Sequence, residues 1–196
     1  MAPESNLAEA EQEQTLVARA IEGDANAFGV LYSRHLDAIY RHVYFRVADV
    51  SLAEDLTEEV FVRAWTGMSK YKPQGHRFTS WLYRIAQNLI VDHYRKHSRR
   101  PQVDDPETEL LPDSQLLPED QISFQQDFEG LANAVQQLGS DEQQVIILRF
   151  VEGLSHREVA EVIGKSEGAS RVIQHRALEA LAGLLEADEQ GQNDRA

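Results

Sequence analysis

Apolar residues recur at every third or fourth position along most of this 196-residue chain, which is the spacing of amphipathic helices. In the first half, the pattern predicts helices over about residues 15–22, 24–47 and 52–65. A fourth is predicted from about Ser80 to about His97, because this stretch has no Pro or Gly and Thr79 or Ser80 can act as its N-cap. Helices with such short connections predict a small bundle over residues 15–100.

Polar positions predict where these helices begin and which sides face outward. Asp24 is predicted to cap the second helix, and Ser51 with Glu54 forms a capping box that opens the third. The buried faces are predicted to contain Leu56, Val60, Phe61, Ala64 and Trp65 on the third helix, and Trp81, Ile85 and Leu89 on the fourth. The other side of the fourth helix mixes cations with an amide. It suits phosphates and unpaired bases, although an ordinary solvated basic face is the alternative.

The second half predicts another helical domain, over residues 120–186. A helix with apolar residues at 4-3-4-3 spacing ends at Gly139, and a capping box of Ser140 and Gln143 opens the next helix, which ends at Gly153. The apolar residues of the first of these two helices are Phe124, Phe128, Leu131, Val135 and Leu138.

A helix-turn-helix pattern follows. It consists of a short helix capped by Ser155 and Glu158, a turn over residues 164–166, and a longer helix from Glu167 to about Leu185. The residues predicted to pack the two helices together are Val159, Ala160, Ile163, Val172 and Ile173. The candidates to face phosphates and base edges are Arg171, Gln174, His175 and Arg176. A packed helical hairpin without DNA contacts is the alternative.

Three segments lack a periodic apolar face. Residues 1–14 and 187–196 are predicted to be disordered tails. Residues 101–119 contain four prolines and several acids but no Lys or Arg, so we expect an extended, self-repelling linker. This polyanion either lies in a positively charged nucleic-acid channel or acts only as a spacer. The predicted fold class is therefore all-α, with two small helical domains joined by an acidic flexible linker.

Charge is divided unevenly along the chain, whose net charge is -14. Residues 34–100 carry twelve basic and seven acidic side chains, whereas residues 101–143 carry eleven acids and no Lys or Arg. Nonspecific DNA affinity comes from cations that neutralise phosphates. We therefore expect the chain alone to bind DNA weakly and a partner to supply much of the affinity.

Composition argues against several other classes of protein. The chain has no Cys, so it has no disulfide framework, and no apolar run approaches the roughly 18 residues of a membrane span. We expect a cytoplasmic protein without stable membrane insertion. His93 and His97 lie one turn apart without a third ligand of suitable spacing, and no nucleophile accompanies the acidic residues. Neither a metal, a cofactor nor an enzymatic activity is expected.

Two segments of the first domain are candidates for binding. Four acids lie close together on the third predicted helix, namely Glu54, Asp55, Glu58 and Glu59. Like charges at i, i+4 spacing destabilise a helix, so a basic partner can explain them, although complementation of the helix dipole is the simpler alternative. The loop over residues 70–78 combines cations, aromatic rings and amides. It can receive an extruded base, or it is only a connector.

These stretches resemble the extracytoplasmic-function (group IV) RNA polymerase sigma factors. The residues similar to the promoter-melting domain of that family are DLTEEVFVRAW at 55–65 and FTSWLYRIAQN at 78–88, with Asp92, Arg95 and Lys96. Those that resemble its C-terminal helix-turn-helix are LSHREVAEVIG at 154–164, with Ser166, Gly168 and His175 to Ala177. The similarity covers about residues 24–185 in family order, with a linker between the two parts.

The resemblance implies a dissociable initiation subunit of bacterial core RNA polymerase, contacting its clamp and flap as well as promoter DNA. Clamp binding is implied for Asp55, Glu58 and Glu59, and a place near the flap for Leu148 and Phe150. Contacts to the minus-ten element and its melting are implied for Lys70, Lys72, His76, Arg77, Phe78, Trp81, Asn88, Asp92, Arg95 and Lys96. Contacts to the minus-thirty-five element are implied for Ser166, Arg171, Gln174, His175 and Arg176. The resemblance also implies an anti-sigma protein as an inhibitory partner.

The second helix of the helix-turn-helix departs from the family pattern. Ser170, Val172, Ile173 and Gln174 stand where we expect an apolar, a small polar, a basic and an apolar residue. This predicts a rotation or a shift of the contacts of that helix. Two rival classes stay open: a self-sufficient helix-turn-helix regulator, and a scaffold protein with no role on DNA.

Overall fold

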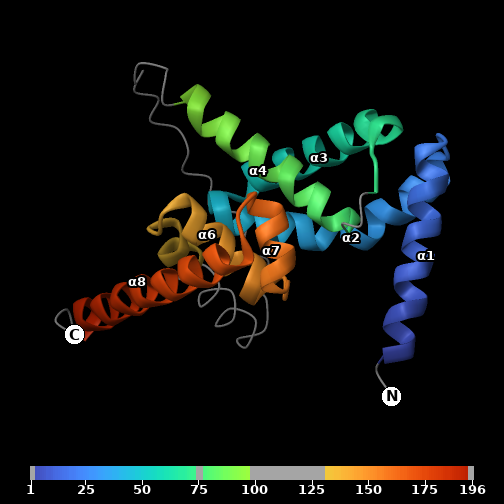
Figure 1. Cartoon of the computed structure of the whole chain (residues 1–196). Coiled ribbons are helices and arrows are strands. Elements are labelled where there is room, and N and C mark those ends of the chain that lie inside the picture. Colours follow the sequence, from blue (N-terminus) through green and yellow to red (C-terminus); the bar gives the residue numbers. More distant parts are fainter. Residues whose placement is uncertain (1–2, 74–76, 98–130, 194–196) are drawn as a thin grey trace, which may run out of the picture.

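The computed structural model describes residues 3–73, 77–97 and 131–193, and all regular structure in this part of the chain is helical. The elements are α1 (Pro3–Ile21), α2 (Ala25–Val47), α3 (Val50–Gly67), the 3-10 turn η1 (Met68–Lys70), α4 (Phe78–His97), α6 (Ser140–Ile146), the π-helical turn η2 (Ile147–Val151), α7 (His156–Ile163) and α8 (Glu167–Asn193) (Figure 1). Residues 131–136 are also helical. The predicted all-α class is confirmed.

Helices α1 to α4 form the first bundle. Its core is completely shielded from solvent at positions such as Leu31, Ile39, Val60 and Leu82, which lie on α2, α3 and α4. Aromatic pairs join α2 to α3 along the edge of this core, with ring centroids 4.7 Å apart for Tyr32 and Phe61 and 5.0 Å apart for Phe28 and Trp65. The bundle fixes the outward sides of α3 and α4, which carry the candidate binding residues.

Two N-caps of the first bundle can be compared with the sequence predictions. Asp24 caps α2 as predicted, because its Oδ1 accepts hydrogen bonds from the backbone amides of Asn26 and Ala27 at 2.9 and 3.1 Å. The predicted capping box at Ser51 is wrong. Asp49 caps α3 instead, accepting from the Leu52 amide at 2.7 Å.

Two other predicted helix starts also differ from the structure. Helix α4 begins at Phe78, so neither Thr79 nor Ser80 is its N-cap. Helix α6 begins at Ser140, and the carboxylate of Glu142 accepts from the Gly139 amide at 3.1 Å. In every case the difference is one or two residues.

The buried side of α4 is rotated relative to the sequence prediction. Leu82, Ala86 and Ile90 are fully buried, whereas Trp81 and Ile85 of the predicted stripe are only half-buried. Other elements cover α4 on two sides, because α2 and α3 pack on it and so does α7 of the second half. On α3, Trp65 was predicted to be buried, but it is exposed at the edge of the bundle.

Both predicted tails contain helix. Helix α1 begins at Pro3 and α8 continues to Asn193, so the predictions of disorder over 1–14 and 187–196 are wrong for these stretches. Both are rich in Ala, Glu and Gln, which favour helix without an apolar stripe. Helix α1 is anchored by its second half, where Leu16, Val17 and Ala20 are buried. The predicted linker over 101–119 lies outside the described residues, as do Phe124 and Phe128.

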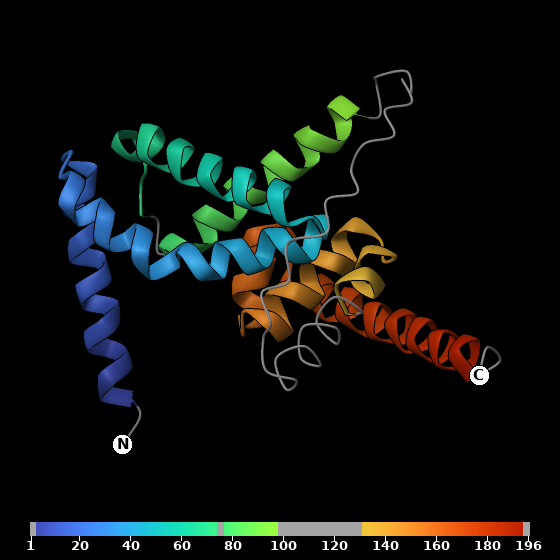
Figure 2. The ribbon, with the colours of Figure 1, turned by 180° about the vertical axis from the view of Figure 1, so that it is seen from behind.

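The second half of the chain packs directly on the first, so one hydrophobic core is continuous across both. Helix α7 lies beside α4 (Figure 1), and its Val159 and Val162 belong to the same buried cluster as the α4 side chains. Seen from behind in Figure 2, the end of α2 reaches the α6 to η2 segment. There Phe45 is buried against Ile146 and Ile147.

A buried carboxylate lies where the two halves meet. The side chain of Glu152, which directly follows η2, is only 3% exposed. Its Oε2 accepts hydrogen bonds from Arg41 Nη2 of α2 and from the Tyr83 hydroxyl of α4, each at 3.1 Å. Burial raises the pKa of Glu152 despite these two partners, and burial also raises the pKa of Tyr83. Glu152 thus joins three helical elements at one point.

Candidate nucleic-acid and partner interfaces

The outward side of α3 presents acids and apolar residues on one face. Asp55 and Glu58 are exposed, and Val62 (58% exposed) and Trp65 follow them at helical spacing. Glu59 is half-buried and forms an i, i+4 ion pair of 2.7 Å with the arginine one turn further on. An exposed surface that combines charge with apolar area is typical of a protein interface.

The loop before α4 brings three aromatic rings together. The ring centroid of Tyr71 lies 4.6 Å from that of Trp81 and 5.8 Å from that of Phe78. Phe78 is 3% exposed, so its ring is enclosed and cannot stack on a base in this arrangement. Trp81 is half-buried at the edge of the cluster and is therefore the more accessible of these two predicted site residues.

The cations of the loop face outward. Lys70 and Lys72 are exposed, while His76 lies outside the described residues. Arg77 forms an ion pair with Glu158 of α7, with its Nε 2.8 Å from Oε1. The loop thus contributes positive charge at the boundary between the two halves. One of its cations, Arg77, is paired with an acid of the second half.

One side of α4 carries most of the remaining residues predicted to contact the minus-ten element. Asn88, Arg95 and Lys96 are exposed, and Asp92 is half-buried. Asp92 Oδ1 accepts a hydrogen bond from Arg95 Nη2 at 2.9 Å, which fixes the guanidinium over this side of the helix. The structure therefore brings these four predicted residues together on one surface.

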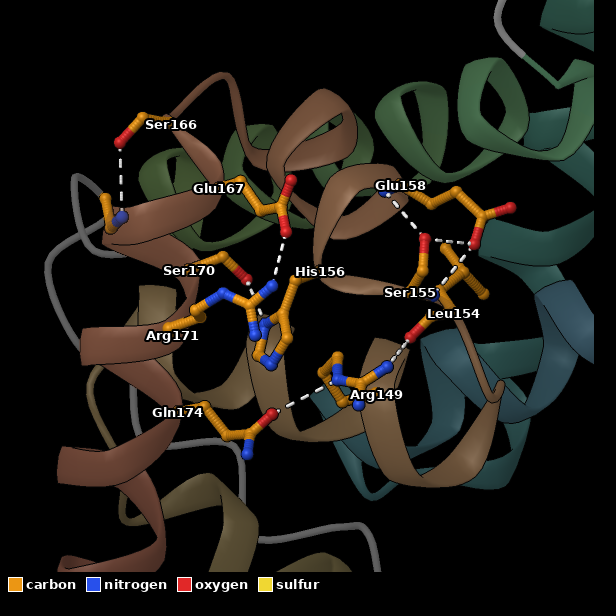
Figure 3. Close-up of polar contacts among 11 residues, drawn as sticks. Arg149, Leu154, Ser155, His156, Glu158, Ser166, Glu167, Ser170, Arg171 and Gln174 are labelled. Atoms are coloured by element: carbon orange, nitrogen blue, oxygen red, sulfur yellow. Dashed lines mark hydrogen bonds and ion pairs between the residues drawn. The ribbon is translucent and has the colours of Figure 1, made fainter.

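The helix-turn-helix forms as predicted, with α7, a turn and α8 (Figure 3). Ser155 caps α7, because its Oγ accepts from the Glu158 amide at 3.3 Å while the Glu158 carboxylate accepts from the Ser155 amide at 2.7 Å. Burial opposes ionisation of Glu158, but the Ser155 hydroxyl and amide, which both donate to its carboxylate at 2.7 Å, and nearby arginines lower its pKa. Gly164 is the C-cap of helix α7, and its φ of +67° is the left-handed conformation that glycine adopts readily.

The five residues predicted to contact the minus-thirty-five element have different surroundings. Ser166 Oγ accepts from the Ala169 amide at 3.1 Å and so supports the first turn of α8. Arg171, His175 and Arg176 are exposed. Gln174 is half-buried, and its Oε1 accepts from Arg149 Nε at 3.1 Å (Figure 3). Four of the five are thus exposed, Ser166 included. Arg171, His175 and Arg176 lie 2.5, 3.4 and 3.8 Å from a glutamate oxygen.

Two residues of α8 lie on the opposite side of the helix from the side that the apolar pattern predicts. Val172 was predicted to pack against α7, but it is 59% exposed. Ser170 is fully buried, 3.2 Å from the Nδ1 atom of His156, and Ala177 is fully buried two turns further on. The spacing of Ser170, Ile173 and Ala177 is the sequence signal for the inner side, and Ser170 obscures it because serine is usually a surface residue.

The described residues show no site for a metal ion and no membrane span. Among them, no group of three or more His, Cys, Asp or Glu side chains is placed to hold a metal ion. No helix in this part of the chain is long and apolar enough to cross a bilayer.

The fold and these surfaces define a class of protein, a two-part helical DNA-binding protein with a C-terminal helix-turn-helix. Comparison with known families shows which class this is. Residues 31–100 match the family Sigma-70 region 2, and residues 128–181 match the family Sigma-70, region 4.

Comparison with individual proteins also shows similarity to sigma factors. The chain is 40% identical over 173 residues to the ECF RNA polymerase sigma factor BldN of Streptomyces coelicolor, covering 88% of this chain and 66% of BldN. It is 30% identical over 163 residues to the ECF RNA polymerase sigma factor SigX of Bacillus subtilis, covering 81% of this chain and 84% of SigX. The solved structure of CnrH in complex with the cytosolic domain of CnrY matches 90% of this chain and 99% of that chain, with a TM-score of 0.70 at 27% identity.

The chain belongs to the ECF RNA polymerase sigma factors. Its function is that of a dissociable factor that directs RNA polymerase in transcription initiation.

Proposed function

We propose that this group IV sigma factor binds bacterial core RNA polymerase through α3, recognises the minus-ten element with α4 and its loop, and recognises the minus-thirty-five element with α8. The observation that carries the proposal is the helix-turn-helix, in which α8 presents Arg171, His175 and Arg176 to solvent while its other side is packed. The factor works in the cytoplasm and has no catalytic activity of its own. Binding energy drives strand opening, because stacking and backbone contacts offset the cost of unstacking each base.

Each surface has a physical basis for its proposed contact. The acidic and apolar face of α3, with Asp55 and Glu58, suits a clamp surface that is basic and partly apolar. Asn88, Arg95 and Lys96 on α4 supply an amide for a base and cations for the backbone. Near the flap, Phe150 offers a 56% exposed ring, whereas Leu148 is buried.

The arrangement of the two halves supports a closed, DNA-free form. The minus-ten and minus-thirty-five elements lie about 25 base pairs apart, which is roughly 85 Å along a duplex. In this structure the two DNA-binding halves touch, with Arg77 and Glu158 joined at 2.8 Å. Both elements are therefore engaged only after the halves separate, and polymerase binding supplies the energy for that separation.

An anti-sigma protein is the second partner that we propose. The similar structure of CnrH is a complex with the cytosolic domain of CnrY, which supports a protein partner for this chain as well. An inhibitor of this kind prevents α3 and α4 from reaching polymerase and DNA.

The test is transcription from a library of random promoter fragments, with bacterial core polymerase in the presence and absence of this chain. Duplex binding by the chain alone is measured in parallel. We expect transcripts only when both components are present, and weak duplex binding without polymerase, because the chain carries a net charge of -14. Tight specific binding by the chain alone, without new transcripts, would instead establish a self-sufficient helix-turn-helix regulator.

A charge reversal separates polymerase docking from DNA recognition in the same assay. Asp55→Arg should abolish binding to core polymerase while the protein stays folded, because Asp55 is exposed on the docking face. Glu22→Arg, a matched reversal at an exposed position before α2, is the control and should leave docking unchanged. Normal core affinity of a folded Asp55→Arg protein would contradict the docking assignment.

A further inference from the structure

One side of α8 points away from the body of the protein and has an unusual composition. Gly168, Val172, His175 and Glu179 follow one another at 4-3-4 spacing, which places them on a single stripe. All four are exposed. A Cβ atom added to Gly168 would meet only Ser166 Oγ, at 4.0 Å, so the stripe begins where another molecule can approach the backbone closely.

The rotation of α8 is fixed by contacts on the opposite side. Ser170 and Ala177 are fully buried, and Ser170 Oγ lies 3.2 Å from His156 Nδ1. Gln174 is held by Arg149, which also donates to the carbonyl oxygen of Leu154 (Figure 3). Because these contacts hold the inner side, Val172 cannot turn inward without breaking them.

Two arginines lie on either side of the stripe. Arg171 pairs with Glu167 on the same helix, and Arg176 lies 3.8 Å from Glu142. Both arginine side chains are exposed, so each can exchange its acidic partner for a phosphate. A helix with cations along both edges fits a groove whose two walls are phosphate backbones, and its central stripe then faces the base edges.

The side chain of Val172, within this stripe, has no group that can form a hydrogen bond. Among the base edges of the major groove, the apolar feature is the 5-methyl group of thymine. An exposed isopropyl group gains free energy by removing apolar area from water, and it does so at a thymine methyl but not at the bare edge of another base.

We propose that Val172 is a specificity-determining residue that reads the 5-methyl group of one thymine in the upstream promoter element. This inference rests on the proposed entry of α8 into the major groove. His175 lies one turn further on the same stripe, with its Nδ1 3.4 Å from Glu179 Oε2, so its Nε2 is the atom that forms a hydrogen bond with an adjacent base. Arg171 and Arg176 hold the phosphates. Gln174, on the inner side, does not read a base.

The test uses the polymerase assembled with the full chain and a promoter obtained from the library. Each thymine of the upstream element, on either strand, is replaced in turn by deoxyuridine, which removes only the methyl group. Transcript yield at limiting holoenzyme is compared for the wild type and Val172→Ala. Val30→Ala, which changes an exposed valine of α2 in the same way, is the matched control.

With the wild-type protein, replacement of one particular thymine by deoxyuridine should lower transcript yield about fourfold, which is the effect of burying roughly one methylene-sized group. Val172→Ala should lower yield by a similar factor on the thymine template and should be indifferent to deoxyuridine at that position. Val30→Ala should keep the full wild-type response. Thermal melting of Val172→Ala should match that of the wild type, since the side chain is exposed.

This experiment distinguishes a failure of the proposal about Val172 from a failure of the proposed function. Wild-type transcripts that are insensitive to every thymine methyl, or a methyl response that persists in Val172→Ala, would overturn the inference about Val172 alone. Absence of any transcript with the wild-type holoenzyme would overturn the proposed function, and the inference with it.

Discussion

His42 is a buried histidine without a hydrogen-bond partner among the described residues. It is fully buried on α2, its ring lies 4.9 Å from that of Tyr83, and no described residue forms a hydrogen bond with either ring nitrogen. Burial, reinforced by the positive charge of Arg46, lowers the pKa of His42 from 6.5 to about 3. Folding therefore requires the neutral imidazole.

This requirement makes stability dependent on pH in a defined direction. Between pH 6.5 and about 3 the unfolded chain binds a proton at His42 that the folded chain does not, so stability falls as pH falls. His42→Leu should remove this contribution. Chemical denaturation at pH 7 and pH 5 should show a loss of stability for the wild type that exceeds that of the variant by about 2 kcal/mol. Equal losses in both proteins would show that His42 is protonated in the folded state.

Single residues were the least predictable part of the candidate site. The exposed positions of Asp55, Asn88, Arg171 and His175 agree with the helical pattern, because polar residues at helical spacing face solvent. Val172 does not, since residue type alone assigns a valine to the inner side. The contact between Ser170 and His156 that decides the rotation of α8 joins two helices, and no local pattern contains it.

Helix boundaries were predictable to within one or two residues for most elements. The periodic pattern locates a helix, but its first residue depends on which side chain reaches the free amides. At α3, both Asp49 and Ser51 are suitable cap types, and only Asp49 makes the hydrogen bond. The long extensions of α1 and α8 were missed because intrinsic propensity, rather than an apolar face, produces them.

The two candidate caps of α3 give a matched pair of variants. Asp49→Ala should lower the free energy of unfolding by about 1 kcal/mol, because it leaves the Leu52 amide without its side-chain partner. Ser51→Ala should change it by only a few tenths of a kcal/mol, since Ser51 is exposed within the first turn. Urea denaturation of both variants distinguishes the caps, and a larger effect at Ser51 would restore the capping box that the sequence predicted.

At the scale of the whole molecule, the sequence predicted two helical domains in the right order but not their contact. The shared core pairs residues far apart along the chain, such as Phe45 with Ile146, and local periodicity carries no information about such pairs. The buried Glu152 was also unpredictable, because a glutamate is normally exposed. Its partners Arg41 and Tyr83 come from two different helices of the other half.

Removing Glu152 should favour separation of the two halves. Glu152→Ala leaves the hydroxyl of the buried Tyr83 without its acceptor, and a buried donor without a partner destabilises the contact between the halves. The Arg41 side chain, which is 42% exposed, loses its ion pair but can be solvated by water. Small-angle X-ray scattering should therefore show a larger radius of gyration for Glu152→Ala than for the wild type.

Two further variants complete that comparison. Glu152→Gln keeps an acceptor for the Tyr83 hydroxyl but loses the charge, so its radius of gyration should lie between those of the wild type and Glu152→Ala. Glu22→Ala removes an exposed glutamate and should scatter like the wild type. Identical scattering from all four proteins would show that Glu152 does not hold the halves together.

The contact between the halves does not depend on the concentration of the protein. Because α4 and α7 belong to one polypeptide, each meets the other at an effective concentration set by the chain between them. Dilution therefore leaves their association unchanged, and the fraction of open molecules is the same at nanomolar and micromolar protein. A competitor that binds either surface keeps most molecules open only above a certain concentration. The ratio of that concentration to the competitor's dissociation constant must exceed the equilibrium constant for closing of the two halves.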